Sequence, residues 1–92
     1  MNAPSAESRA TLARGVRLRN DPLTGEPLLL YPEGILPLDE SARDILIRCD
    51  GKLTLAEIAR ALSEEYEAEP DDLLPDITEC LVQLREEMLV TW

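Results

Sequence analysis

Alternating and consecutive apolar positions give the first half of this chain a strand-like pattern. Residues 16–19 alternate aliphatic side chains with arginines, and residues 28–31 are apolar at every position. Turn-forming residues separate these runs, first over residues 20–25 and then over residues 32–34, which read Pro-Glu-Gly. Alternation is typical of strands and turn formers mark their ends. The pattern predicts three strands, of which residues 35–38 form the third.

A proline identifies the third strand as an edge of the sheet. Pro37 has no backbone N–H, and prolines within sheets are confined to edge strands, strand starts and bulges. The three strands are therefore expected to form a small antiparallel sheet with an open side along residues 35–38.

From residue 39 onward, apolar residues recur at helical spacing and predict three amphipathic helices. Asp39 is the expected N-cap of the first helix, and Gly51 follows its end. Thr54 and Glu57 have the spacing of a capping box for the second, and an aspartate at 71–72 is the expected cap of the third. The positions expected to be buried are Ala42, Ile45, Leu46 and Cys49 in the first helix, Leu55, Ile58, Ala59, Leu62 and Tyr66 in the second, and Leu74, Ile77, Leu81, Leu84 and Met88, with Cys80 alongside, in the third.

The order of these elements predicts an α+β fold. A three-stranded antiparallel sheet followed by three helices is winged-helix-like, and residues 14–92 are expected to form this single domain. Residues 1–13 read as a flexible N-terminal arm, because they are rich in small and polar residues and show no apolar periodicity. Leu89 and Val90 are expected to add a final extended segment.

Composition narrows the setting of the domain. The chain of 92 residues carries a formal charge of −10, and no apolar run approaches the ~20 residues of a membrane span. The N-terminus lacks the apolar stretch of a secretory signal, so a cytoplasmic protein without membrane contact is expected. Acidic residues gather over 64–79 and arginines over 9–19, which indicates either a solvated helix face or pairing between the two ends of different protomers.

Candidate chemistry is scarce, so the sequence favours a binding protein over an enzyme. The chain has no histidine, one lysine and two cysteines, Cys49 and Cys80, which lie on apolar faces and read as small buried hydrophobes. Neither a metal site nor a cofactor site is expected. The order of elements makes a winged-helix DNA-binding or adaptor protein the first alternative. Against DNA binding, the third helix carries a single arginine among six acidic residues and would repel phosphates.

The architecture permits capture of an extended peptide. A peptide can add to an exposed strand edge through main-chain hydrogen bonds, while pockets for alternate side chains determine specificity. Residues 35–38 would offer the edge, and Ile77, Cys80, Leu81 and Leu84 would offer an apolar floor. The same residues are equally expected as ordinary core, with Pro37 protecting the edge from aggregation. The pattern of residues leaves both interpretations open.

A joint set of motifs resembles one known family. The motifs are Gly15-Val16-Arg17-Leu18-Arg19, Asp21, Leu29-Leu30-Tyr31-Pro32-Glu33-Gly34, Ile45-Leu46, Cys49-Asp50-Gly51, and Asp76-Ile77 with Leu81 and Leu84. Together they resemble the PqqD family, the peptide chaperones of pyrroloquinoline quinone (PQQ) biosynthesis. The resemblance extends from about residue 14 to the end of the chain.

The resemblance implies a function, partners and a site. Such proteins bind a ribosomally made precursor peptide and present it to a radical S-adenosylmethionine (SAM) enzyme that joins a glutamate and a tyrosine of that peptide. They have no catalysis or cofactor of their own. Carried over to this chain, the peptide would lie between Ile35, Leu36 and Leu38 on one side and Asp76, Ile77, Cys80, Leu81 and Leu84 on the other. Arg17 and Arg19 would either anchor peptide carboxylates or pair with the acidic helix face. Independently of the resemblance, the basic and flexible N-terminus allows an arm exchanged between two protomers, which would give a homodimer.

Overall fold

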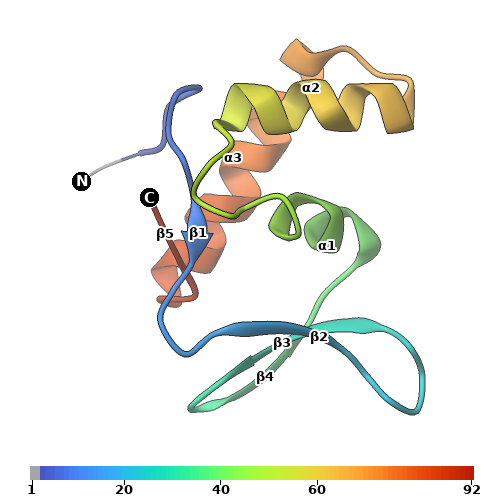
Figure 1. The fold of residues 1–92 in the computed structure, drawn as a ribbon, viewed down its shortest axis with the longest axis vertical. Coiled ribbons are helices and arrows are strands. Elements are labelled where there is room, and N and C mark those ends of the chain that lie inside the picture. Colours follow the sequence, from blue (N-terminus) through green and yellow to red (C-terminus); the bar gives the residue numbers. More distant parts are fainter. Residues whose placement is uncertain (1–2) are drawn as a thin grey trace.

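The computed structural model describes residues 3–92 as a sheet of three strands beside three helices, with a second, two-stranded pairing at the chain ends (Figure 1). The elements in chain order are β1 (Thr11–Leu12), β2 (Arg17–Asn20), β3 (Pro27–Tyr31), β4 (Gly34–Pro37), α1 (Glu40–Leu46), α2 (Leu55–Tyr66), α3 (Pro70–Glu86) and β5 (Val90–Thr91). This is the expected α+β arrangement. Among these helices, none has both the length and the apolar character that crossing a bilayer requires.

The sheet is an antiparallel meander with β4 at one edge and β2 at the other. Leu29 lies opposite Leu18 on β2 and Leu36 on β4, so these three side chains share one face of the sheet. That face packs toward α1, and Leu29 is completely buried. The expected position of Pro37 on an edge strand is confirmed.

The helices begin largely where their capping residues predict. The Asp39 side chain accepts a hydrogen bond from the backbone N–H of Ala42 at 2.8 Å and starts α1. Thr54 and Glu57 form the predicted capping box of α2. The start of α3 was predicted wrongly: Pro70 occupies its first position after Glu69, which makes no side-chain cap. Proline suits a first position because its fixed φ matches the helix and its missing N–H would have had no intrahelical acceptor.

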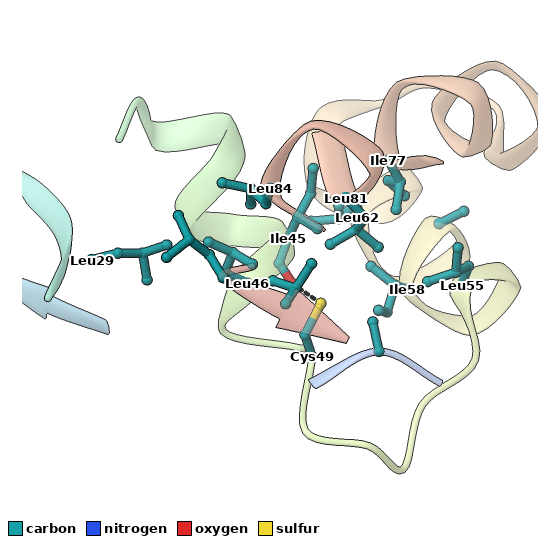
Figure 2. Close-up of a cluster of buried hydrophobic side chains, with 14 residues drawn as sticks. Leu29, Ile45, Leu46, Cys49, Leu55, Ile58, Leu62, Ile77, Leu81 and Leu84 are labelled. Atoms are coloured by element: carbon teal, nitrogen blue, oxygen red, sulfur yellow. Dashed lines mark hydrogen bonds between the residues drawn. The ribbon is translucent and has the colours of Figure 1, made fainter. Parts of the chain in front are cut away.

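The core lies between α2, α3, the end of α1 and the buried face of the sheet (Figure 2). Leu55, Ile58, Leu62, Ile77 and Leu81 pack there with 3% or less of each side chain exposed. The core is built from branched aliphatic side chains because the chain has few aromatic residues.

Two residues expected in the buried stripes are exposed. Tyr66 is 46% exposed at the last turn of α2, where its hydroxyl donates a hydrogen bond to the Asp44 carboxylate on α1. Met88 is 81% exposed because α3 ends at Glu86, and residue 88 has a left-handed φ of 63° that turns the chain toward β5. The expected extended segment at Leu89 and Val90 is present, and both side chains are buried.

The N-terminal segment lies against the helices, in contrast to the arm expected from its composition. The backbone carbonyls of Ala6 and Ser8 accept hydrogen bonds from the first N–H groups of α2, at 2.9 and 3.0 Å. The Ala10 carbonyl accepts from Gly51 N–H at 3.0 Å, and the Ala10 side chain is fully buried. Strand β1 then pairs with β5. A two-residue strand is too short to show alternation, which is why the pattern did not reveal it.

Candidate functional site

The outer edge of β4 offers a short stretch of unpaired backbone. Leu38 N–H donates to the Pro27 carbonyl at 3.0 Å, and hydrogen-bonded residues alternate along an antiparallel pair. The backbone groups of Gly34, Leu36 and Leu38 therefore face β3, and those of Ile35 and Pro37 face outward. Because Pro37 has no N–H, the open edge presents the N–H and C=O of Ile35 and the C=O of Pro37.

A hollow of about 410 Å³ begins where this edge ends and lies between the start of α1 and one face of α3. It is lined by Pro37, Leu38, Asp39, Ser41, Ala42, Ile45, Asp76, Glu79, Cys80, Gln83 and Leu84. The α3 members follow one another at alternating spacings of three residues and one residue, so they form one continuous face of the helix. The hollow has the combination that a ligand site needs, an apolar floor with polar groups at its margin.

The charged groups of the hollow are all acidic. Asp39, Asp76 and Glu79 line it, and no lysine or arginine is among its lining residues. Asp39 already accepts the capping hydrogen bond of α1. Burial, with a smaller contribution from the nearby Asp39 carboxylate, raises the pKa of the Cys80 thiol. Cys80 therefore serves as an apolar part of the floor and not as a nucleophile.

The structure brings together only part of the residue set expected for the peptide site. Leu38, Asp76, Cys80 and Leu84 line the hollow. Ile35 and Leu36 lie on β4 with their side chains on opposite faces of the sheet, Ile35 58% exposed and Leu36 packed against the core.

Ile77 and Leu81 lie in the core and not in the hollow. Their side chains are 1% and 0% exposed, and Figure 2 shows both close to Leu62 of α2. The face of α3 that they occupy packs against α2, so these two side chains hold α3 in place and do not face the hollow. For these two residues the structure favours the interpretation as ordinary core.

The α1 side of the hollow was missed by the sequence-based interpretation. Ser41, Ala42 and Ile45 form it, and only two residues separate the end of β4 from the start of α1. That short connection was the available signal, because it places the first turn of α1 directly beside the edge strand. On α3, Glu79 and Gln83 were missed, although each lies three residues after a predicted member.

The Cys49 thiol is held in its protonated form, and no metal centre is found within residues 3–92. Burial is the largest of the effects that raise the pKa of the Cys49 thiol to about 12, and its Sγ donates to the Ile45 carbonyl at 3.3 Å. No three His, Cys, Asp or Glu side chains of this part of the chain converge in a way that could hold a metal ion. The site consists of an edge strand and an adjoining hollow, which is typical of small α+β domains that recognise an extended ligand.

Comparison with known proteins agrees with a small α+β domain that recognises an extended ligand, and it identifies the family. The model of the family described as coenzyme PQQ synthesis protein D (PqqD) matches residues 26–90. A relative from Xanthomonas oryzae pv. oryzae, named PqqA binding protein, is 34% identical over 90 residues, which cover 98% of each chain. A Rhizobium meliloti protein of the same name is 37% identical over 73 residues, or 79% of this chain and 74% of the relative. The chain belongs to the PqqD family.

Solved structures show the same fold. The solution NMR structure of the PqqD truncation of Methylobacterium extorquens PqqCD has a TM-score of 0.86 and 34% identity, and the match covers 98% of this chain and 96% of that one. That protein is described as a stand-alone recognition element for ribosomally synthesised and post-translationally modified peptides. The crystal structure of PqqD from Xanthomonas campestris has a TM-score of 0.60 and 33% identity, covering 89% of this chain and 91% of that one.

Proposed function

We propose that this chain binds the ribosomally made precursor peptide of PQQ at the open edge of β4 and in the hollow beside it. The observation that carries the proposal is the continuity of the two features at Pro37, where the unpaired edge leads into the hollow. A peptide added as a strand would bond to Ile35 and to the Pro37 carbonyl, then place an apolar side chain against Leu38, Cys80 and Leu84. The relatives named PqqA binding protein and the solved recognition element support this assignment.

Delivery to an enzyme completes the proposal. The bound peptide is presented to the radical SAM enzyme that joins its glutamate and tyrosine, and this chain takes no part in the chemistry. The raised pKa values of both thiols and the lack of histidine support a binding role. Because Pro37 removes one donor from the edge, the pairing with the peptide is short, and the hollow must supply much of the affinity.

A calorimetric titration with the synthetic precursor peptide tests the binding. The unaltered chain is expected to bind one peptide per chain, whereas Gln83→Trp should weaken binding at least tenfold because the exposed Gln83 lines the hollow and an indole there fills it. Asp72→Trp is the matched control, since Asp72 is exposed on the same helix and lines no part of the hollow. Equal affinities for the two variants, or no binding by the unaltered chain, would contradict the proposal. A salt-dependent shift of duplex DNA would instead favour a winged-helix DNA-binding protein.

A further inference from the structure

The hollow beside β4 combines an apolar floor with an acidic margin. Figure 2 shows two members of the floor, Ile45 of α1 and Leu84 of α3, beside one another. The margin carries the carboxylates of Asp39, Asp76 and Glu79, and all three side chains are exposed. Asp76 and Leu84 are eight residues apart on α3, or about 12 Å along the helix axis. A ligand that fills the hollow must therefore suit both surfaces within a short distance.

The carboxylates of the margin are not neutralised by residues of the described chain. Asp39 accepts the capping hydrogen bond from Ala42 N–H at 2.8 Å, and this neutral donor leaves the charge of the carboxylate in place. For Asp76 and Glu79, no ion pair is found in the described part of the chain. The margin therefore attracts a positive charge from a ligand.

The arginines on the elements around the hollow have partners elsewhere. The pairs are Arg43 with Asp44 at 3.3 Å on α1, Arg48 after α1 with Glu65 on α2, and Arg85 on α3 with the ring of Trp92, whose centroid lies 4.4 Å from the guanidinium carbon. Arg17 and Arg19, for which the sequence allowed pairing with the acidic helix face, lie on β2 at the opposite edge of the sheet from β4. No ion pair is found for either residue among residues 3–92. Since none of these arginines lines the hollow, its charge stays negative.

We infer that the hollow selects a lysine or arginine of the peptide, close in sequence to the apolar residue that rests on the floor. The inference rests on the proposed function and deepens it by naming the chemistry that the peptide must carry. A lysine or arginine has an apolar stem and a charged head, so it suits a floor and margin of this kind. Its head would donate charge-assisted hydrogen bonds to Asp76 and Glu79.

The spacing of an extended peptide matches the two surfaces. Side chains two residues apart in a strand lie on one side, about 7 Å from each other. Cys80 of the floor and Asp76 of the margin are four residues apart on α3, or about 6 Å along its axis. An apolar peptide side chain against Cys80 would therefore place the basic side chain two residues away beside Asp76.

Other positively charged ligands fit the hollow less well. No three His, Cys, Asp or Glu side chains converge within residues 3–92 in a way that could hold a metal ion. The basic N-terminal segment of a second copy is also a weaker candidate, because this segment is bound within its own chain. There Arg9 Nε donates to the Lys52 carbonyl at 3.1 Å.

Calorimetric titration with the synthetic precursor peptide at low and high salt tests the inference. Asp76→Asn/Glu79→Gln keeps the shapes of both side chains and removes their charges. It is expected to weaken peptide binding at least about fivefold at low salt, and by less at high salt, because ions screen exposed charges. The matched control is Asp72→Asn/Glu86→Gln, which changes the net charge equally at exposed positions of α3 that do not line the hollow. Circular dichroism confirms that both variants are folded.

Peptide variants identify the residue that enters the hollow. Each lysine or arginine of the peptide is replaced in turn with methionine, which keeps an unbranched apolar stem and removes the charge. One replacement should weaken binding to the unaltered chain at least about fivefold. The same replacement should change binding to Asp76→Asn/Glu79→Gln less than about twofold, because the partner charges are already absent.

Several results would overturn the inference. Unchanged or tighter peptide binding by Asp76→Asn/Glu79→Gln would do so, as would an equal loss in the control, which would reduce the effect to net charge. A peptide in which no lysine or arginine is sensitive to replacement would also contradict it. Self-association of the unaltered chain that this variant loses would assign the margin to a second copy. Failure of the proposed function is distinguishable, because the unaltered chain would then not bind peptide or Gln83→Trp would have no effect.

Discussion

Leu81 and Cys80 are neighbours on α3, yet they have different tasks. Leu81 is completely buried against α2, whereas Cys80 is partly exposed and lines the hollow. A helix turns by about 100° per residue, so adjacent positions on α3 face different surroundings. Substitutions of Leu81 therefore report on stability, and only residues such as Gln83 report on the ligand site.

Replacing Leu81 with alanine is expected to lower the free energy of unfolding by about 2–5 kcal/mol. The loss combines the transfer of the removed methyl groups with the cavity left in a core of close-packed aliphatic side chains. Urea denaturation followed by circular dichroism measures it. Gln83→Ala, at an exposed position of the same helix, should change the free energy by less than about 0.5 kcal/mol. A similar small change for Leu81→Ala would mean that Leu81 is not a core residue.

The Cys49 thiol makes stability depend on alkaline pH. Burial, the largest cause, raises its pKa from 9.0 to about 12, so the folded state holds this proton more tightly than the unfolded state does. The resulting contribution is fully present below pH 9.0 and is lost as the pH rises toward 12. The loss is on the order of 1 kcal/mol for each pH unit in that window.

Comparison with Cys49→Ala isolates this contribution. Denaturation in urea is measured at pH values from about 8 to about 10.5. The unaltered chain should lose stability relative to the variant once the pH exceeds the pKa of the free thiol. Tyrosines titrate in both proteins, so their effect cancels in the difference. A difference that stays constant over this range would mean that the Cys49 thiol is not buried in the folded protein.

At the scale of elements, the start of α2 depends on a reciprocal pair of hydrogen bonds. Thr54 Oγ1 accepts from Glu57 N–H at 3.1 Å, and the Glu57 carboxylate accepts from Thr54 N–H at 2.8 Å. Thr54→Ala removes the first bond and should destabilise the protein by about 1 kcal/mol. Thr54→Ser keeps a hydroxyl at this position and should retain most of the stability. Equal losses for the two variants in urea denaturation would show that the cap does not support the helix.

Elements with strong local signals were predictable from the sequence, and elements defined by distant partners were not. Turn residues at 20–25 and 32–34 marked the strands, and Asp39 and Thr54 marked two helix starts, because these side chains act on backbone groups within a few residues. Strand β1 forms by pairing with β5, in which Thr91 lies opposite Thr11 although the two are eighty residues apart in the sequence. No local pattern contains that information.

The same distinction applies to the hollow. The spacing of α3 identified Asp76, Cys80 and Leu84 as neighbours, but the pattern did not separate the hollow face from the core face that holds Ile77 and Leu81. Which face is covered depends on where α2 packs, and that is decided by the tertiary arrangement. Residues 28–31 likewise appeared in the sequence to be covered on both sides, yet Leu28 and Leu30 lie on the face of the sheet that does not pack against the core.

At the scale of the whole molecule, the N-terminal segment connects parts of the fold that lie far apart in the sequence. It accepts hydrogen bonds from the start of α2 and from Gly51, and its strand pairs with the chain's last strand. The homodimer suggested by the sequence stays a prediction. An exchange of this segment would require a partner's copy to replace the contacts that the segment makes within its own chain.

Removal of residues 1–13 tests whether this segment is a flexible arm or part of the folded domain. Residues 14–92 alone would lose the β1–β5 pairing, the Ala10 side chain in the core and three carbonyl acceptors. At roughly 1 kcal/mol for each hydrogen bond, together with the lost apolar contact, the free energy of unfolding is expected to fall by about 2–4 kcal/mol. Removal of residues 1–4 is the control, because it leaves all of these contacts intact. Equal stability of both shortened chains in urea would mean that the segment is an arm. Light scattering tests the exchange separately: a dimer of the full chain that is lost only when residues 1–13 are removed would show that the segment is exchanged between protomers.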